Sequence, residues 1–189
     1  MDEVIKDLIT ELSNDPFNPV LSTTIAYEYE KIGQTASAVS FYLRTAEYGY
    51  HTHPEHVYAS LLRSSDCFEG QKNRTNTVLN LILKAIAYFP NRPEAWFKLS
   101  QYYERNKKWQ ESYTAAEVGL TFSRHRMAPL PLSVEYLGEY VLTFQKAVAA
   151  WWVGRKDESK ELLESLSKMN IAPLYARAVE RNLKQTGDV

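Results

Sequence analysis

The sequence predicts an all-α protein of about ten helices, joined in antiparallel pairs. Apolar residues recur at helical spacing along nearly the whole chain, as in Leu8 with Leu12 and in Leu79 with Leu83. No stretch shows the strict alternation of apolar and polar residues that is typical of strands. Short breaks separate the helical stretches, and they carry proline just ahead of a new helix, where its missing N–H costs no hydrogen bond.

The breaks recur at a regular interval. The turns inside the predicted helix pairs are marked by four residues at intervals of 37, 37 and 47 positions: Gly33, Gly70, Lys107 and Gly154. The last interval is longer because it includes the proline-containing loop SRHRMAPLPLS, residues 123–133. We therefore expect a single domain over residues 1–189 that consists of a half-repeat at 2–14, repeats at about 19–50, 54–90, 93–122 and 133–169, and a capping helix at about 172–186.

The third repeat carries the clearest motif. It places four residues at the spacing W-x2-L-small-x2-Y: Trp96, Leu99, Ser100 and Tyr103. This motif resembles the tetratricopeptide repeat (TPR), a pair of antiparallel helices of about 34 residues. The second repeat departs from the pattern, with Arg63 at the small position and an insertion near Lys72. The resemblance implies a right-handed superhelical stack of helix pairs, a TPR-like α-solenoid.

A second resemblance extends from Ile25 to Leu183. Its most specific phrases are QTASAVSFYLRTAE at residues 34–47 and FQKAVAAWW at residues 144–152. They resemble the helical-repeat region attached to family 2 glycosyltransferases, especially those of tailed phages that infect cyanobacteria. The resemblance implies a non-catalytic companion of sugar-transfer machinery, with a glycosyltransferase as its protein partner. The transferase itself is not expected here, because the chain has no D-x-D pair for a metal-bound sugar nucleotide.

Composition argues against several kinds of partner. The 22 basic and 23 acidic residues give a net charge of -1, so no global field attracts nucleic acid or an anionic membrane surface. The longest apolar run, AVAAWWVG, is far shorter than the roughly 20 residues needed to cross a bilayer. Cys67 is the only cysteine, and the opening MDEVIKDLITEL is acidic and amphipathic, unlike a signal peptide. We expect a cytoplasmic protein, in the host cell if a phage encodes it.

Chemical motifs are sparse, and we expect neither an enzyme nor a cofactor. The sequence contains no phosphate-binding glycine loop and no hydrolase or zinc-protease motif. His51, His53 and His56 with Glu55 could offer ligands to zinc or nickel, but a polar loop between repeats is the favoured interpretation and no metal site is predicted. Cys67 lies in a predicted helix, where a lone cysteine is usually an inert small hydrophobe.

Helical phase divides the aromatic residues between packing and exposed positions. Three are expected to fill the seam between helices and repeats: Trp96, Tyr103 and Tyr113. Three residues of the capping helix are expected to cover the last repeat: Leu174, Ala178 and Leu183. The inward-facing first-helix positions are predicted to line a concave groove: Tyr27, Glu30, Lys31, Ser64, Phe68, Phe97, Gln101, Arg105, Phe144, Val148 and Trp151.

Two functions remain open from the sequence. The first is a non-catalytic scaffold whose groove holds a peptide or helix of another protein, which suits a lining of mixed aromatic and polar residues. The alternative is an accessory of a sugar-transfer system that contacts a glycan through exposed Tyr and Trp, because aromatic rings stack on sugars as readily as on protein.

Overall fold

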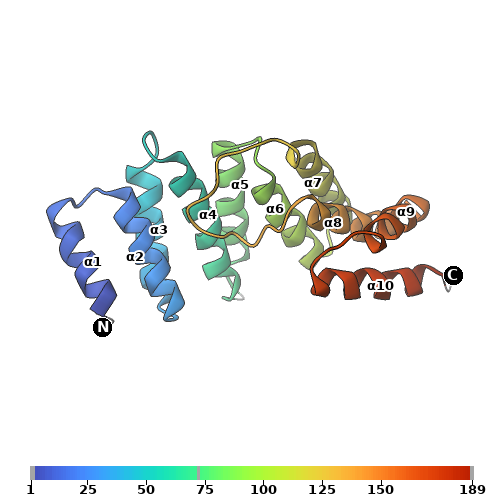
Figure 1. The fold of residues 1–189 in the computed structure, drawn as a ribbon, viewed down its shortest axis with the longest axis horizontal. Coiled ribbons are helices and arrows are strands. Elements are labelled where there is room, and N and C mark those ends of the chain that lie inside the picture. The colour runs from blue at the N-terminus through green and yellow to red at the C-terminus, as the bar shows by residue number, and fades with distance from the viewer. Residues whose placement is uncertain (1–2, 72, 188–189) are drawn as a thin grey trace. The chain divides into compact units, whose positions relative to one another are not determined.

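The computed structural model describes residues 3–71 and 73–187, so the predicted first residue Asp2 and the centre of the predicted insertion, Lys72, lie outside the described residues. Within the described ranges, ten α-helices follow one another and no strand occurs, which confirms the all-α prediction (Figure 1). These residues form two compact units. Unit 1 runs to Pro90 and includes Met127–Val134, while unit 2 comprises Asn91–Arg126 and the described residues from Glu135 onward.

Unit 1 contains five helices: α1 (Glu3–Asn14), α2 (Pro19–Lys31), α3 (Thr35–Tyr48), α4 (Pro54–Glu69) and α5 (Thr75–Tyr88). Helix α2 begins at Pro19 because the Asn18 side chain accepts hydrogen bonds from the first free N–H groups, those of Val20 and Leu21. One core cluster of this unit consists of Ala26, Ala38 and Tyr42. We call these three residues the Tyr42 cluster.

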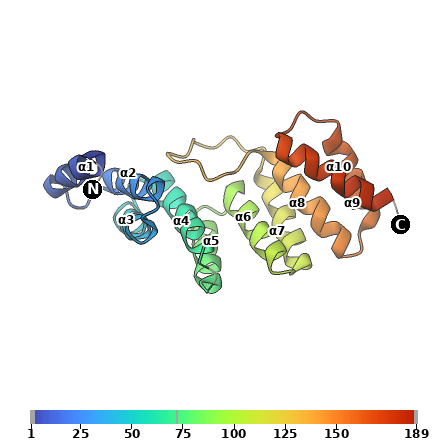
Figure 2. The same cartoon turned by 90° about the horizontal axis from the view of Figure 1, so that it is seen from below.

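Unit 2 contains the other five helices: α6 (Pro93–Arg105), α7 (Trp109–Phe122), α8 (Glu139–Trp152), α9 (Lys156–Ser167) and α10 (Pro173–Gly187). Each of the helices α6 to α9 packs on the next, and α10 packs on α9 and α8 (Figure 2). The core has one cluster around Phe97, Ala116, Val141 and Leu142, and another around Ala147, Leu163, Leu166 and Val179.

The turns inside the helix pairs repeat the same backbone geometry. Gly33, Lys107 and Gly154 have φ angles of 74°, 57° and 85°, in the left-handed region that glycine tolerates best. Gly70 differs, with a φ of −61°, so α4 ends without this left-handed turn. Three of the four positions that were aligned in the sequence therefore form equivalent turns.

Candidate functional site

Residues of α2 and α4 in unit 1 gather around one guanidinium group. The Glu30 carboxylate accepts hydrogen bonds from Nη2 and Nε of Arg63 at 2.5 and 3.1 Å, and from the Tyr42 hydroxyl at 2.7 Å. The centre of the Tyr27 ring lies 5.9 Å from Cζ of Arg63 and 5.3 Å from Nζ of Lys31. We call Tyr27, Glu30, Lys31 and Arg63 the α2–α4 face. The structure thus brings three predicted groove residues together around Arg63, which was not among the residues predicted to line the groove.

Neighbouring groups shift the pKa values of Arg63 and Tyr42. Burial works against the charge of Arg63, but the hydrogen bonds and the negative charge of Glu30 outweigh it and raise the Arg63 pKa. Burial and the neighbouring Glu30 carboxylate likewise raise the pKa of the Tyr42 hydroxyl, which stays protonated and donates. Because its carboxylate partner holds it on one side, the guanidinium is oriented in advance for a further acceptor.

That further acceptor comes from the chain itself. Nη1 of Arg63 donates to the main-chain carbonyl of Ser133 at 3.2 Å. The neighbouring Leu132 packs against the Tyr42 cluster, as does Cys67 of α4. Both cartoon views draw this loop, which bends at Pro131 and Leu132, beside α4 (Figures 1 and 2). A segment distant in the sequence therefore lies on the α2–α4 face.

Two other predicted groove residues of unit 1 lie elsewhere on α4. Ser64 is fully buried, so its predicted place in an open groove is wrong. It shares one helical stripe with Val57 and Leu61, which are both in the core. Phe68 is half-buried, with the Arg74 guanidinium 5.9 Å from its ring centre.

In unit 2, the predicted phase of α6 is wrong. Phe97 was expected to face the groove, but it is only 2% exposed and packs against α7 and α8 residues and Tyr136, whose ring centre is 5.8 Å away. Trp96, which was expected in the core, is half-buried and lines a pocket of about 260 Å³. Adjacent helical residues point about 100° apart, so a shift of one residue exchanges the two roles. Gln101 is half-buried and Arg105 is exposed.

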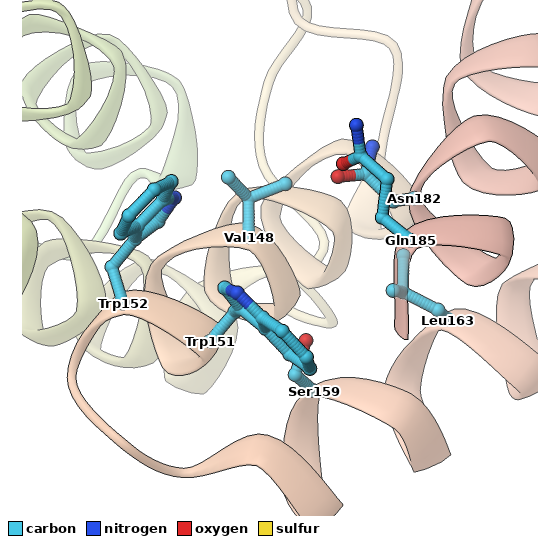
Figure 3. Close-up of a pocket in the computed structure, with 7 residues that line it drawn as sticks. All are labelled: Val148, Trp151, Trp152, Ser159, Leu163, Asn182 and Gln185. Atoms are coloured by element: carbon cyan, nitrogen blue, oxygen red, sulfur yellow. The ribbon is translucent and has the colours of Figure 1, made fainter. Parts of the chain in front are cut away.

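The remaining predicted groove residues lie on α8, and α10 packs over them. The ring of Phe144 contacts the ring of Tyr175 edge-on at 5.4 Å. Val148 and Trp151 line a cavity of only about 60 Å³, to which α10 contributes Asn182 and Gln185 (Figure 3). This part of the predicted groove is therefore filled by the protein's own last helix, and it leaves no room for a peptide.

The cap itself uses different residues from those expected. Leu174 is 70% exposed, so its predicted role in covering the last repeat is wrong. Val179 is buried instead, and Leu183 packs against the same cluster as predicted. Ala178 is half-buried. On α10, Val179 is therefore buried in place of its neighbour Ala178, while Leu183 lies where it was expected.

An ionic network joins three helices of unit 2 around Tyr113, which is buried as expected. Its hydroxyl donates to Glu158 at 3.0 Å and accepts from Arg155 at 2.9 Å, while Lys146 pairs with Glu158 at 2.9 Å. Partial burial would raise the Glu158 pKa. The hydrogen bonds from Lys146 and Tyr113 and the charges of Lys146 and Arg155 outweigh this and lower it.

This network predicts a pH dependence of stability. A carboxyl group whose pKa is lowered by folding stabilises the protein above its unfolded pKa, about 4.3 for Glu, and this contribution is lost as the pH falls through the folded value. We expect Glu158→Gln to lower the free energy of unfolding at pH 7 and to have less effect at pH 3, as measured by urea denaturation. The exposed Glu161→Gln in the same helix serves as control. An equal effect of Glu158→Gln at both pH values would contradict the stabilising role of the network.

Two further groups of titratable residues were candidates from the sequence, Cys67 and the histidines at 51, 53 and 56. Burial raises the pKa of the Cys67 thiol to about 12, so it is protonated near neutral pH and a poor nucleophile. The rings of His53 and His56 meet edge-on at 5.7 Å, whereas His51 contacts Tyr50. Across residues 3–71 and 73–187, no three His, Cys, Asp or Glu side chains are placed to hold a metal ion. No helix of the described chain is long and apolar enough to cross a bilayer.

A second apolar surface in unit 1 was missed from the sequence. Residues of α3, α4 and α5 and the turn after α3 line a pocket of about 440 Å³: Leu43, Ala46, Tyr50, Val57, Leu61, Lys84, Ala87 and Tyr88. We call it the α3–α5 pocket. Leu43, Ala46 and Tyr50 follow one another at intervals of three and four residues, so a second apolar stripe on α3 was the signal for it.

Comparison with known proteins supports the fold. Neither protein-family models nor curated proteins match the sequence. Among solved structures, MamA from Desulfovibrio magneticus RS-1 aligns with a TM-score of 0.61 at 13% identity, over 96% of this chain and 86% of that one. TTC0263, a thermophilic TPR protein from Thermus thermophilus, aligns with a TM-score of 0.58 at 11% identity, over 98% and 89%. The chain has the tetratricopeptide-repeat fold.

A third structure is that of YrrB, a TPR protein described as having an unusual peptide-binding site. It aligns with a TM-score of 0.51 at 9% identity, over 92% of this chain and 97% of that one. At such identities the likeness concerns the fold alone.

Proposed function

We propose that this TPR protein is a non-catalytic scaffold that binds an extended segment of another protein on the α2–α4 face. The observation that carries the proposal is that this face already holds a non-helical segment of the chain, with an apolar side chain on the Tyr42 cluster and a main-chain carbonyl on Arg63. A main-chain hydrogen bond combined with an apolar anchor is a general way to recognise an extended peptide.

The composition of the face suits a protein partner. Tyr and Arg are enriched among the residues that dominate binding energy at protein interfaces, and Tyr27 and Arg63 stand side by side here. The ion pair with Glu30 holds Arg63 in place before a partner arrives, which lowers the entropy lost on binding. The balanced net charge of -1 favours a protein over nucleic acid or an anionic membrane surface.

The resemblance of residues 34–47 and 144–152 to repeat regions attached to phage glycosyltransferases supports a more specific partner. We infer that the bound segment belongs to a family 2 glycosyltransferase or to another phage protein of surface-sugar assembly. The encounter would take place in the reducing cytoplasm of the host cell, where the lone Cys67 stays a thiol.

A matched pair of double variants tests the proposal. Tyr27→Ala with Lys31→Ala alters the α2–α4 face, whereas Tyr50→Ala with Lys84→Ala makes the same two changes in the α3–α5 pocket. Affinity-tagged proteins are used to capture partners from native lysate, and the captured proteins are quantified by mass spectrometry. We expect the first variant to capture at least about tenfold less partner than the parent does. A tenfold loss corresponds to the removal of about 1.4 kcal/mol of binding free energy.

The control variant should retain the partner at the level of the parent, and both variants should keep the helicity of the parent by circular dichroism. If the partner is instead lost from the Tyr50 and Lys84 variant and kept by the Tyr27 and Lys31 variant, the binding surface is the α3–α5 pocket and the proposal is wrong.

Contact with a glycan is the alternative, and one observation favours it. Trp152 is 60% exposed and stacks on Trp109, with ring centres 5.1 Å apart and planes inclined by 15°. The outer face of such an exposed indole could stack on a sugar ring. A glycan array probed with the parent and with Trp152→Ala tests it, and binding that disappears with the indole would support this function.

A further inference from the structure

The connection between α7 and α8 is much longer than the other connections between the described helices. It covers residues 123–138, whereas residues 49–53 join α3 to α4 and residues 89–92 join α5 to α6. Loops longer than about 12–15 residues without secondary structure are uncommon in compact domains and are often functional. The middle of this connection, Met127–Val134, has the sequence MAPLPLSV and groups with unit 1.

Two prolines restrict the conformation of this segment, which bends at Pro131 and Leu132. Pro129 and Pro131 fix their own φ angles, and each disfavours helical geometry in the residue before it. Such a segment loses less conformational entropy on docking than a flexible loop would. The residue that follows the segment, Glu135, has a φ of 61°, which is rare for a residue other than glycine.

Two adjacent residues hold the segment on the α2–α4 face. Leu132 supplies the apolar contact with the Tyr42 cluster, and Ser133 supplies the carbonyl that accepts from Arg63. Val134, the last residue of the segment, is buried. The remaining polar atoms of Arg63 are engaged by Glu30, so the carbonyl of Ser133 takes the position that a bound peptide would need.

We propose that Met127–Val134 is an internal ligand of the α2–α4 face. The partner is an extended peptide of the same chemistry, with a leucine-like side chain in the place of Leu132 and a main-chain carbonyl in the place of Ser133. This peptide must displace Met127–Val134 in order to bind. This inference rests on the proposed function and adds the chemical class of the ligand and a regulatory contact. The face is closed in the free protein and opens when a competing segment is present.

Competition by the tethered segment should weaken the apparent affinity for a free peptide by an amount that can be estimated. A tethered segment acts at an effective concentration of about 1 mM. A free peptide with an intrinsic dissociation constant of about 100 µM would therefore appear roughly tenfold weaker while the internal segment competes with it. Removing the internal segment should restore the intrinsic affinity without any change in the face itself.

The variant Leu132→Asp releases the segment, because a carboxylate is disfavoured on the apolar Tyr42 cluster. Leu137→Asp is the matched control, since it makes the same change at an exposed leucine of the same connection. Circular dichroism and urea denaturation first establish that each variant is folded. Leu132→Ser, which introduces no charge, is a second release variant and is judged by the same criteria.

The first readout is the alkylation rate of Cys67, the only cysteine in the chain. This thiol lies one helical turn after Arg63 on α4 and packs against the same cluster as Leu132, so we expect the docked segment to shield it. We expect iodoacetamide to react severalfold faster with the Leu132→Asp protein than with the parent or Leu137→Asp. The new carboxylate of Leu132→Asp would by itself raise the pKa of the Cys67 thiol and slow the reaction. A faster rate would therefore show that release of the segment has exposed the thiol.

The second readout is fluorescence anisotropy with a labelled synthetic peptide, MAPLPLSV. We expect it to bind the full-length Leu132→Asp protein about tenfold more tightly than the parent or Leu137→Asp, and a peptide with aspartate at the position of Leu132 not to bind. Equal alkylation rates together with equal peptide affinities in parent and release variants would overturn the internal-ligand inference alone. Faster alkylation without peptide binding would contradict the binding function of the face, and the inference with it.

Discussion

Replacing Phe97 by alanine is expected to lower the free energy of unfolding of unit 2 by about 3–5 kcal/mol. The ring is 2% exposed and packs on Ala116, Val141 and Leu142, so its removal leaves a cavity among three helices. Trp96→Ala should cost clearly less, although it removes a larger side chain. The indole is only half-buried and lines an open pocket, so water can fill the vacated space.

Urea denaturation followed by circular dichroism compares the two variants without relying on tryptophan fluorescence, which Trp96→Ala would itself alter. A larger loss of stability for Trp96→Ala than for Phe97→Ala would show that the phase of α6 is the one expected from the repeat motif. The packing around Phe97 described above would then be wrong.

Introducing one methyl group at Gly119 is expected to destabilise the protein by about 1–3 kcal/mol. A Cβ atom at this position of α7 would lie 2.8 Å from Cδ2 of Leu142 and 2.9 Å from Cβ of Trp96. The leucine can rotate away, but the Cβ of Trp96 moves only with the backbone of α6. The overlap therefore outweighs the gain of about 0.5–1 kcal/mol that alanine normally brings to a helix.

Gly70→Ala is the matched control, because no atom lies within 4 Å of the added Cβ and its φ of −61° suits alanine. It should leave thermal stability unchanged or raise it slightly by restricting the unfolded chain. If thermal unfolding shows Gly119→Ala to be as stable as Gly70→Ala, the close crossing of α6, α7 and α8 at this glycine is not as described.

Local signals in the sequence predicted the helices well. Pro19, Pro54 and Pro93 each begin a helix at the expected residue, because proline is tolerated in the first turn. Gly33 and Gly154 form the expected turns. The extent of the single predicted domain, 1–189, stays a prediction. Helical phase was less secure, because α6 and α10 carry apolar residues at adjacent positions and only the neighbouring helices decide which of them is buried.

The candidate site depended on contacts between distant parts of the chain. The sequence placed Tyr27, Glu30 and Lys31 on one side of α2, but nothing in it showed that Arg63 would join them. Arg63 was noted only as a departure from the small residue of the repeat motif, and such a departure was the available signal. The docking of Leu132 joins residues about 100 positions apart, and helical periodicity carries no information at that range.

Hydrogen–deuterium exchange on the complex with the captured partner shows directly whether the partner binds the α2–α4 face and displaces Met127–Val134. We expect slower exchange in α2 around Tyr27–Lys31 and in α4 around Arg63 when the partner binds, together with faster exchange of the amides between Met127 and Val134 as the internal segment leaves. Slower exchange confined to the α3–α5 pocket, around Leu43–Tyr50 and Lys84–Tyr88, with α2, α4 and Met127–Val134 unchanged, would contradict it.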